Sequence, residues 1–179
     1  MSDRQEILGF WFSPRVNKHW FSSTPALDVE IQNRFEGIWY RAAAGALDVW
    51  AETPEGALAL VVVLDQFPLN MYRGKPASFS TEQKAVAVAK QAVAEGFHTG
   101  LPEERRLFLF MPLMHSENLD DQDLSVRLFR EAGLDSRWPE HHREIIRRFG
   151  RFPHRNAILG RESTPEELDY LASDGAFTG

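Results

Sequence analysis

The sequence predicts an all-α fold, and three observations lead to that prediction. Helix-start signals, Ser or Thr followed by Pro or by a Glu or Gln three residues on, recur along the chain. The alternation of apolar and polar residues that marks a half-buried strand never persists over several positions. The longest apolar run, Ala57–Leu64, follows such a start signal and continues into Asp65, which favours a helix over a buried strand.

About eight helices are expected, joined by short turns, and Gly133 and Gly150 follow two of them as stop signals. Short connections favour antiparallel neighbours, so the helices should form hairpins within one domain spanning residues 1–179. A bundle and a stacked superhelix both fit that pattern. The expected segments are Ser2 to Phe12, Thr24 to about Ala44, Thr53 to Phe67, Ser80 to near Gly96, Pro102 onward, Asn118 to Ala132, about Trp138 to Phe149, and Thr164 onward.

Composition limits the function classes. The chain has 179 residues, 43% of them hydrophobic, and no cysteine, so disulfides and thiolate metal sites are excluded and a reducing cytosol is favoured. The N-terminal residues show no export signal, and the longest apolar run is too short for a membrane span. A net charge of −6 argues against general nucleic-acid binding. We therefore expect a soluble cytoplasmic protein that acts neither on membranes nor on nucleic acids.

Arginine is concentrated near the C-terminal end. Six arginines lie between Arg143 and Arg161 against the single acid Glu144, and no lysine follows Lys90. Arginine is preferred where a planar fork grips a carboxylate or phosphate, whereas lysine would serve for solubility alone. A GC-rich genome would also enrich arginine, and this alternative stays open for Arg143 and Arg147.

Two stretches share an elbow pattern: "QFPLNMYRG" from Gln66 and "RFPHRNAILG" from Arg151. Proline disfavours helical geometry for the residue before it, so a helix should stop at the Phe of each elbow, Phe67 and Phe152. The Phe and Pro residues are expected to be architectural. Sharp turns could aim the neighbouring polar side chains into one cleft, namely Asp65, Arg73, Arg151, His154 and Arg155. Asp65 is expected to pair with an arginine of the second elbow.

Four segments together resemble the bacterial family called domain of unknown function 924: "ILGFWF", "LDQFPLNMYRG", "MPLMHSENLDDQDLSVRLF" and "HREIIRRFGRFPHRNAILGRESTPEEL". The resemblance covers about Ile7 to Leu171. It implies an all-helical fold similar to tetratricopeptide-repeat superhelices, and it implies no established activity. The positions that match the family's pattern are Asp65, Gln66, Asn70, Arg73, His115, Ser116, Glu117, Gln122, His142, Arg148, Arg151, His154, Arg155 and Asn156.

These residue types are compatible with three kinds of chemistry. His115 and Glu117 are expected in a nonhelical turn after Pro112, and with His142 they match the inventory of a zinc or iron centre, but the spacing matches no known helical metal motif. Ser116 lacks the sequence frame of a catalytic nucleophile. General acid–base work by histidine stays open because imidazole titrates near neutrality. No metal or cofactor is assigned.

A binding role accounts for more of these polar and charged residues than any of the three reactions. Arg, His and Asn on a concave helical surface would grip a small anionic ligand, a carboxylate or a phosphate, or an acidic peptide. An enzyme using histidine acid–base or His/Glu metal-assisted hydrolysis in the same cleft is the alternative, and the oligomeric state is not indicated. The predicted ligand-binding residues are Asp65, Arg73, His115, Glu117, His142, Arg148, Arg151, His154, Arg155 and Asn156.

Overall fold

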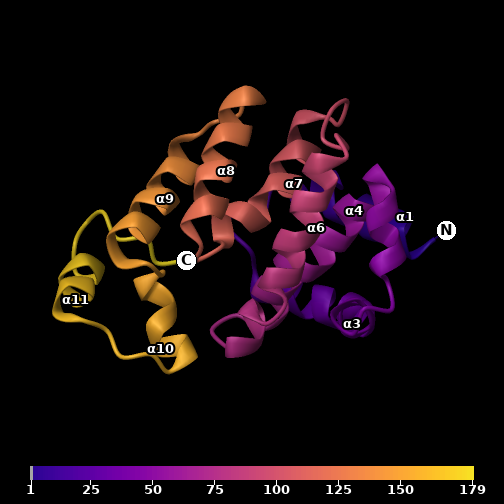
Figure 1. Ribbon diagram of the computed structural model, residues 1–179. Coiled ribbons are helices and arrows are strands. Elements are labelled where there is room, and N and C mark those ends of the chain that lie inside the picture. Colours follow the sequence, from indigo (N-terminus) through magenta and orange to yellow (C-terminus); the bar gives the residue numbers. More distant parts are fainter. Residues whose placement is uncertain (1) are drawn as a thin grey trace. The chain divides into compact units, whose positions relative to one another are not determined.

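The computed structural model describes residues 2–179, in which the regular elements are helices and no strand occurs. The all-α prediction is therefore confirmed. The chain forms two compact units (Figure 1): the first comprises the chain up to Arg73 with Ala77–Pro112, and the second comprises Gly74–Pro76 with Leu113–Gly179. Whether the chain behaves as one domain, and whether its helices stack like tetratricopeptide repeats, stay predictions.

The first unit holds the N-terminal helices. They are α1 (Asp3–Trp11), α2 (Pro14–Asn17), α3 (Pro25–Ala43), α4 (Pro54–Val61), α5 (Phe67–Met71), α6 (Glu82–Ala94) and the greater part of α7 (Glu103–His115), with a 3-10 turn at Asp48–Glu52 and a π-helical turn at Val62–Gln66. Every residue of the apolar run in α4 and the π turn is fully buried. Helix α4 is thus the centre of the first unit's core, as the unbroken apolar run requires.

The second unit holds the C-terminal helices. They are α8 (Leu119–Glu131), α9 (Arg137–Phe149), α10 (Asn156–Leu159) and α11 (Pro165–Leu171), with a 3-10 turn at Pro153–Arg155. A further 3-10 turn, Pro76–Phe79, has its first residue in the second unit and the others in the first. Helices α8 and α9 lie side by side (Figure 1). The core beneath α9 is built on Ile145, Ile146 and Phe152, with Tyr170 and Phe177 packed against it.

Most predicted helix starts are confirmed. Ser2 and Thr164 each form a complete capping box, and Thr24, Thr53 and Asn118 accept main-chain N–H bonds at the starts of α3, α4 and α8. The cap of α6 was predicted one residue too early. Thr81 precedes α6, and its hydroxyl donates to the carbonyl of Leu64 instead of capping the helix, because that buried carbonyl needs a donor.

Two predicted helix breaks are wrong. Phe67 keeps helical geometry (φ −60°, ψ −45°), and the chain passes from α4 through the π turn into α5 with Pro68 near its start. The π turn supplies the physical reason: it widens the helix just before Pro68, where a proline at an early helical position sacrifices no hydrogen bond. Pro112 lies inside α7, which continues to His115, so His115 is the last helical residue, and Ser116 and Glu117 lie in the link before α8.

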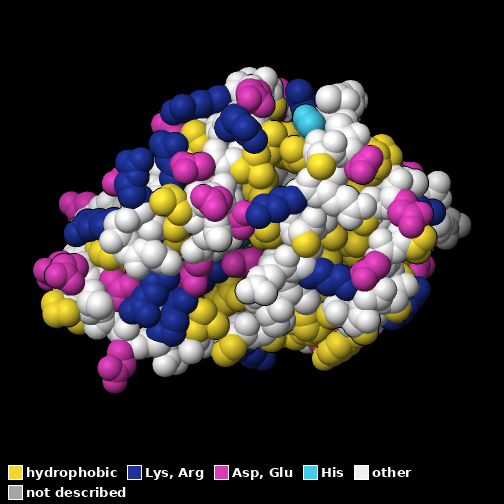
Figure 2. Space-filling model, in the orientation of Figure 1, with side chains coloured by type: hydrophobic (Ala, Val, Ile, Leu, Met, Phe, Trp, Pro, Cys, Tyr) yellow, Lys and Arg dark blue, Asp and Glu magenta, His cyan; other side chains and the backbone are white. Residues whose placement is uncertain are grey.

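In residues 2–179, none of the helices combines the length and apolar character that crossing a bilayer requires. On the face drawn in Figure 2, Lys and Arg side chains alternate with Asp and Glu side chains over the part of the molecule that contains α8 and α9. The arginine-rich end of the chain therefore does not present an unbroken cationic surface on this face.

Candidate functional site

The second elbow has the predicted backbone. Gly150 ends α9 in the left-handed region (φ +71°), and Phe152 is extended (φ −88°, ψ 110°) before Pro153. The ring of Phe152 is fully buried in the core of the second unit. The elbow is thus a rigid support for Arg151, which bonds to Glu167, and for His154, which contacts Phe152 and Phe177.

Glu117 fastens this elbow to the turn after α7. Its Oε1 accepts the main-chain N–H of Phe152 at 2.8 Å, and its two carboxylate oxygens accept Nη2 and Nη1 of Arg161 at 2.8 and 2.7 Å. Burial raises the pKa of Glu117, but the hydrogen bonds from Arg161 and Phe152 outweigh burial and leave the pKa below its usual value. Glu117 is therefore an ionised structural anchor.

Glu167 anchors the other side of the elbow. Nε and Nη2 of Arg151 donate to its two oxygens at 2.7 and 2.9 Å, and the Asn156 amide donates at 3.1 Å. The Glu167 side chain is only 2% exposed, and the hydrogen bond from Arg151 is the main reason why its pKa falls to about 2. Arg151 and Asn156 thus hold an internal carboxylate, and Arg151 also donates to the carbonyl of Glu162.

Arg155 lies beneath the same elbow. Its Nη2 donates to the carbonyl of His115 at 2.8 Å, and its guanidinium lies 4.7 Å from the centre of the Phe152 ring. The residue is only 5% exposed. Arg155 therefore ties the end of α7 to the 3-10 turn by a charge-assisted hydrogen bond and a cation–π contact.

Two predicted histidines meet around one phenyl ring. The ring centre of Phe177 lies 4.4 Å from that of His142 and 4.9 Å from that of His154, and both imidazoles also contact Phe152. Nδ1 of His142 lies 2.8 Å from the carbonyl of Trp138, which can only accept, so Nδ1 carries the proton. Burial lowers the pKa of His142 to about 3 and that of His154 to about 4, and the charge of Arg155 adds to the shift of His154.

Ser116 is not placed as a nucleophile would be. Its hydroxyl donates to Oδ2 of Asp121 at 2.7 Å and also accepts the N–H of Asn118, so it belongs to the start of α8. The Ser116 hydroxyl thus donates to a carboxylate and accepts a main-chain N–H just before α8. In the part of the chain that the structure describes, no three His, Asp or Glu side chains are grouped so as to hold a metal ion.

Two of the predicted residues, Asp65 and Arg73, lie in the first unit. Asp65 is 4% exposed in the π turn, where the Gln66 amide lies 2.6 Å from its Oδ2. Arg73 is mostly exposed and pairs with Asp28 through Nε at 3.1 Å. The predicted pairing of Asp65 with an elbow arginine, and the inclusion of Asp65 and Arg73 in one binding cleft, stay predictions.

One hollow of the second unit retains unused hydrogen-bond donors, and we call it the Arg148 hollow. It measures about 440 Å³ and is lined by Arg148, Phe149, Arg151, Thr164, Glu166 and Glu167. Arg148 takes part in no ion pair within residues 2–179, although its guanidinium lies 4.6 Å from the Phe149 ring centre. Two of the predicted residues, Arg148 and Arg151, are therefore brought together here.

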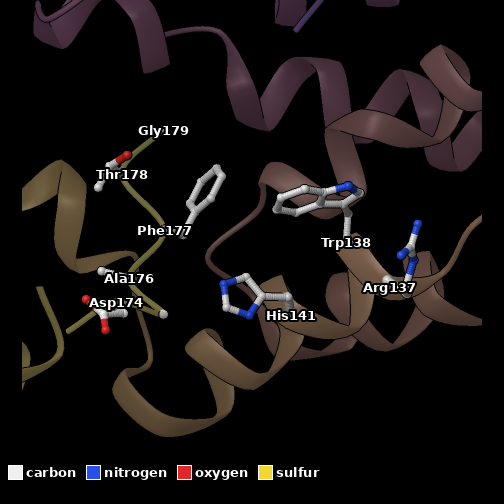
Figure 3. Close-up of a pocket in the computed structure, with 9 residues that line it drawn as sticks. Arg137, Trp138, His141, Asp174, Ala176, Phe177, Thr178 and Gly179 are labelled. Atoms are coloured by element: carbon white, nitrogen blue, oxygen red, sulfur yellow. The ribbon is translucent and has the colours of Figure 1, made fainter.

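A second hollow, the α9–tail hollow, was not predicted. It measures about 600 Å³ and lies between the start of α9 and the C-terminal segment Asp174–Gly179 (Figure 3). Trp138 and His141 line it from α9, and Phe177 lines it from the C-terminal segment. The sequence carried one usable signal for it, a tryptophan followed three residues later by histidine on an otherwise charged helix.

The fold and the site define an all-helical protein whose arginine-rich elbow is held by internal carboxylates. The chain belongs to the bacterial family of proteins of unknown function DUF924, whose model matches residues 7–175. It is similar to a solved structure of a protein of unknown function from Agrobacterium tumefaciens, with 38% identity, a TM-score of 0.89, and coverage of 94% of this chain and 96% of that one. No curated protein matches the chain.

Proposed function

We propose that the protein binds a small anionic ligand, a carboxylate or a phosphate, in the Arg148 hollow. One observation carries the proposal: the Arg148 guanidinium enters no ion pair within residues 2–179, yet shares a concave surface with a second arginine. Three other arginines near the elbow already bind groups of the protein: Arg151 pairs with Glu167, Arg161 pairs with Glu117, and Arg155 donates to the carbonyl of His115. Arg148 therefore has a guanidinium group that is able to pair with an external anion.

Two further donors line the same hollow. Nε and Nη2 of Arg151 donate hydrogen bonds to Glu167 and to the carbonyl of Glu162. Its Nη1 makes no hydrogen bond within the described residues. The Thr164 hydroxyl oxygen accepts the N–H of Glu167, which leaves the hydroxyl proton to donate. One oxyanion could therefore receive hydrogen bonds from two guanidinium groups and a hydroxyl, the arrangement that favours carboxylate or phosphate.

The donors are held in place before any ligand arrives. The Arg148 guanidinium lies over the Phe149 ring, and Arg151 is fixed by three hydrogen bonds to Glu167 and Glu162. Fixed side chains lose little further freedom on binding, so more of the interaction appears as affinity. The charge of Glu167 is already neutralised by Arg151, whereas Glu166 at the hollow opposes an anion. The volume suits a small ligand or one acidic side chain better than a long peptide.

The alternative of histidine acid–base catalysis draws less support. His142 and His154 are covered by Phe177, and burial lowers their pKa values to about 3 and about 4. A general base works best when its pKa lies near the operating pH, and these two imidazoles are weak bases at neutrality.

Thermal unfolding in matched salts tests the proposed function. Phosphate, sulfate or succinate should stabilise the protein beyond chloride at equal ionic strength, by about 2.7 kcal/mol at a hundredfold excess over the dissociation constant. Arg148→Gln should abolish the gain. Arg147→Gln is the matched control, because Arg147 is the neighbouring exposed arginine and pairs only with Glu144. Equal stabilisation by chloride, or equal gains in both variants, would overturn the proposal.

We also infer a cytoplasmic location, which the absence of cysteine from the 179 residues supports because reducing compartments do not sustain disulfides. Cell fractionation with compartment markers tests it, and recovery of the protein with periplasmic or membrane markers would contradict it.

A further inference from the structure

The α9–tail hollow exposes an aromatic face that the core of the second unit leaves uncovered. Trp138 lies in the first turn of α9 and is 58% exposed, more than either other large exposed hydrophobic side chain of α8 or α11, Leu119 at 41% or Leu168 at 56%. Tryptophan side chains usually bury most of their surface, so an indole left open inside a hollow suggests contact with a ligand. The hollow's volume of about 600 Å³ lies within the usual range for small-molecule sites.

Three aromatic rings from two elements border this space. Figure 3 shows the indole of Trp138 and the phenyl ring of Phe177 on either side of a gap, with the imidazole of His141 between and below them. The ring of His141 stands at 81° to that of Trp138 and at 76° to that of Phe177, with ring centres 6.4 and 6.5 Å apart. A flat ring entering the gap would contact Trp138, which is 58% exposed.

The C-terminal segment supplies polar groups to the same hollow. Residues 176–179 form neither helix nor strand, and they line the hollow opposite α9. Within residues 2–179, the N–H of Thr178 and the carbonyls of Ala176 and Phe177 take part in no hydrogen bond. Main-chain donors and acceptors of this kind can pair with the edge of a heterocycle whose face is stacked on an aromatic side chain.

We propose that the α9–tail hollow is a binding site for a planar heteroaromatic ring with hydrogen-bonding groups on its edge, stacked on Trp138. The aromatic side chains favour a flat ligand. The unpaired main-chain groups of the C-terminal segment favour a ring with polar atoms on its edge over a hydrocarbon ring. The site shares no lining residue with the Arg148 hollow. Its ligand and the anionic ligand can therefore be tested independently.

The test follows the tryptophan side chains of the intact protein by NMR. The chain has five tryptophans, and Trp138→Leu identifies the indole N–H resonance of Trp138 by its loss. Adenosine, a planar heterocycle on a sugar, should shift that resonance saturably, whereas ribose, the same sugar without the base, should not. Benzyl alcohol, a flat ring without a polar edge, should bind more weakly than adenosine.

Affinity measured by calorimetry completes the test. Trp138→Leu should weaken adenosine binding about tenfold or more, as expected for loss of a stacking platform, and Trp138→Phe should fall between Trp138→Leu and the wild type. Phe21→Leu is the control, because Phe21 is a 74% exposed aromatic of the first unit. The proposal is overturned if adenosine causes no saturable shift, if ribose or benzyl alcohol binds as well as adenosine, or if Trp138→Leu and Phe21→Leu behave alike.

Discussion

Arg161 and Glu117 form a bidentate ion pair across 44 residues of sequence, with Nη1 to Oε2 at 2.7 Å and Nη2 to Oε1 at 2.8 Å. The same carboxylate accepts the N–H of Phe152, and the same guanidinium donates to the carbonyl of Phe152 at 3.2 Å. Two charged side chains thereby satisfy both main-chain groups of the elbow's extended residue. The pair is three-quarters buried at each end, at 24% and 25% exposure.

Breaking this pair should destabilise the protein. Arg161→Ala removes a charge-assisted, partly buried bond and leaves Glu117 without its cation, so we expect a loss of about 1.5–3 kcal/mol in the free energy of unfolding. Urea denaturation measures it. Arg147→Ala is the control, because the pair of Arg147 with Glu144 is at least 60% exposed at both ends and should contribute less than about 1 kcal/mol. Equal losses in the two variants would contradict an anchoring role for Glu117.

Stability should fall as the pH drops below about 6.5. In the unfolded chain the two histidines bind protons near pH 6.5, whereas in the folded protein burial lowers the pKa of His142 to about 3 and of His154 to about 4. The unfolded state therefore binds more protons between about pH 6.5 and 4, which favours unfolding by up to about 1.4 kcal/mol per pH unit for each imidazole. Urea midpoints at pH 7, 6 and 5 should decline less steeply in His154→Gln. Parallel declines would show that His154 does not titrate in this way.

Removing Phe177 should bring the two histidine pKa values back towards that of free imidazole. The phenyl ring covers both imidazoles, at 4.4 Å from His142 and 4.9 Å from His154, and burial is the main cause of their lowered pKa values. NMR titration of Phe177→Ala should show both pKa values raised. Leu168→Ala, which removes an exposed side chain of α11, should leave them unchanged. Unaltered pKa values in Phe177→Ala would mean that other groups bury the histidines.

Neutralising Glu166 should tighten anion binding. Glu166 lines the Arg148 hollow, where its negative charge opposes that of the ligand. A unit charge a few ångströms away in a water-filled site contributes about 1 kcal/mol, so Glu166→Gln should strengthen succinate or phosphate binding about fivefold. Calorimetric titration measures the change. An equal or weaker affinity in Glu166→Gln would place the anion away from this hollow.

Local rules were sufficient for most of the fold. Capping residues, prolines and glycines act within one helical turn, so the starts at Ser2, Thr24 and Thr164 and the stop at Gly150 could be predicted from neighbouring residues. The misplaced break at Phe67 has a different origin. Proline does disfavour a helical residue before it, but a π turn, which no short pattern announces, let the helix continue.

The site was harder to predict because the partners of the arginines are distant in sequence. The arginine-rich stretch has a single acid among its own residues, so the sequence predicts that Arg148, Arg151 and Arg155 are available to an external anion. The structure supplies Glu167 as the partner of Arg151, 16 residues away, and Glu117 as the partner of Arg161, 44 residues away. The clustering of His142 with His154 likewise depends on Phe177, a residue beyond every recognisable motif. Composition predicted the cations, but only tertiary structure decides which of them is unpaired.

The most direct test of the proposed function observes the guanidinium of Arg148 itself. In a protein with isotope-labelled arginine, the Nε–H resonance of Arg148, identified by its loss in Arg148→Gln, is followed during titration with succinate at constant ionic strength. We predict a saturable shift of this resonance with the dissociation constant found by calorimetry, while the Arg147 resonance moves little. If the Arg148 resonance does not move, or if those of Arg147 and Arg148 drift together without saturation, the Arg148 hollow is not an anion-binding site.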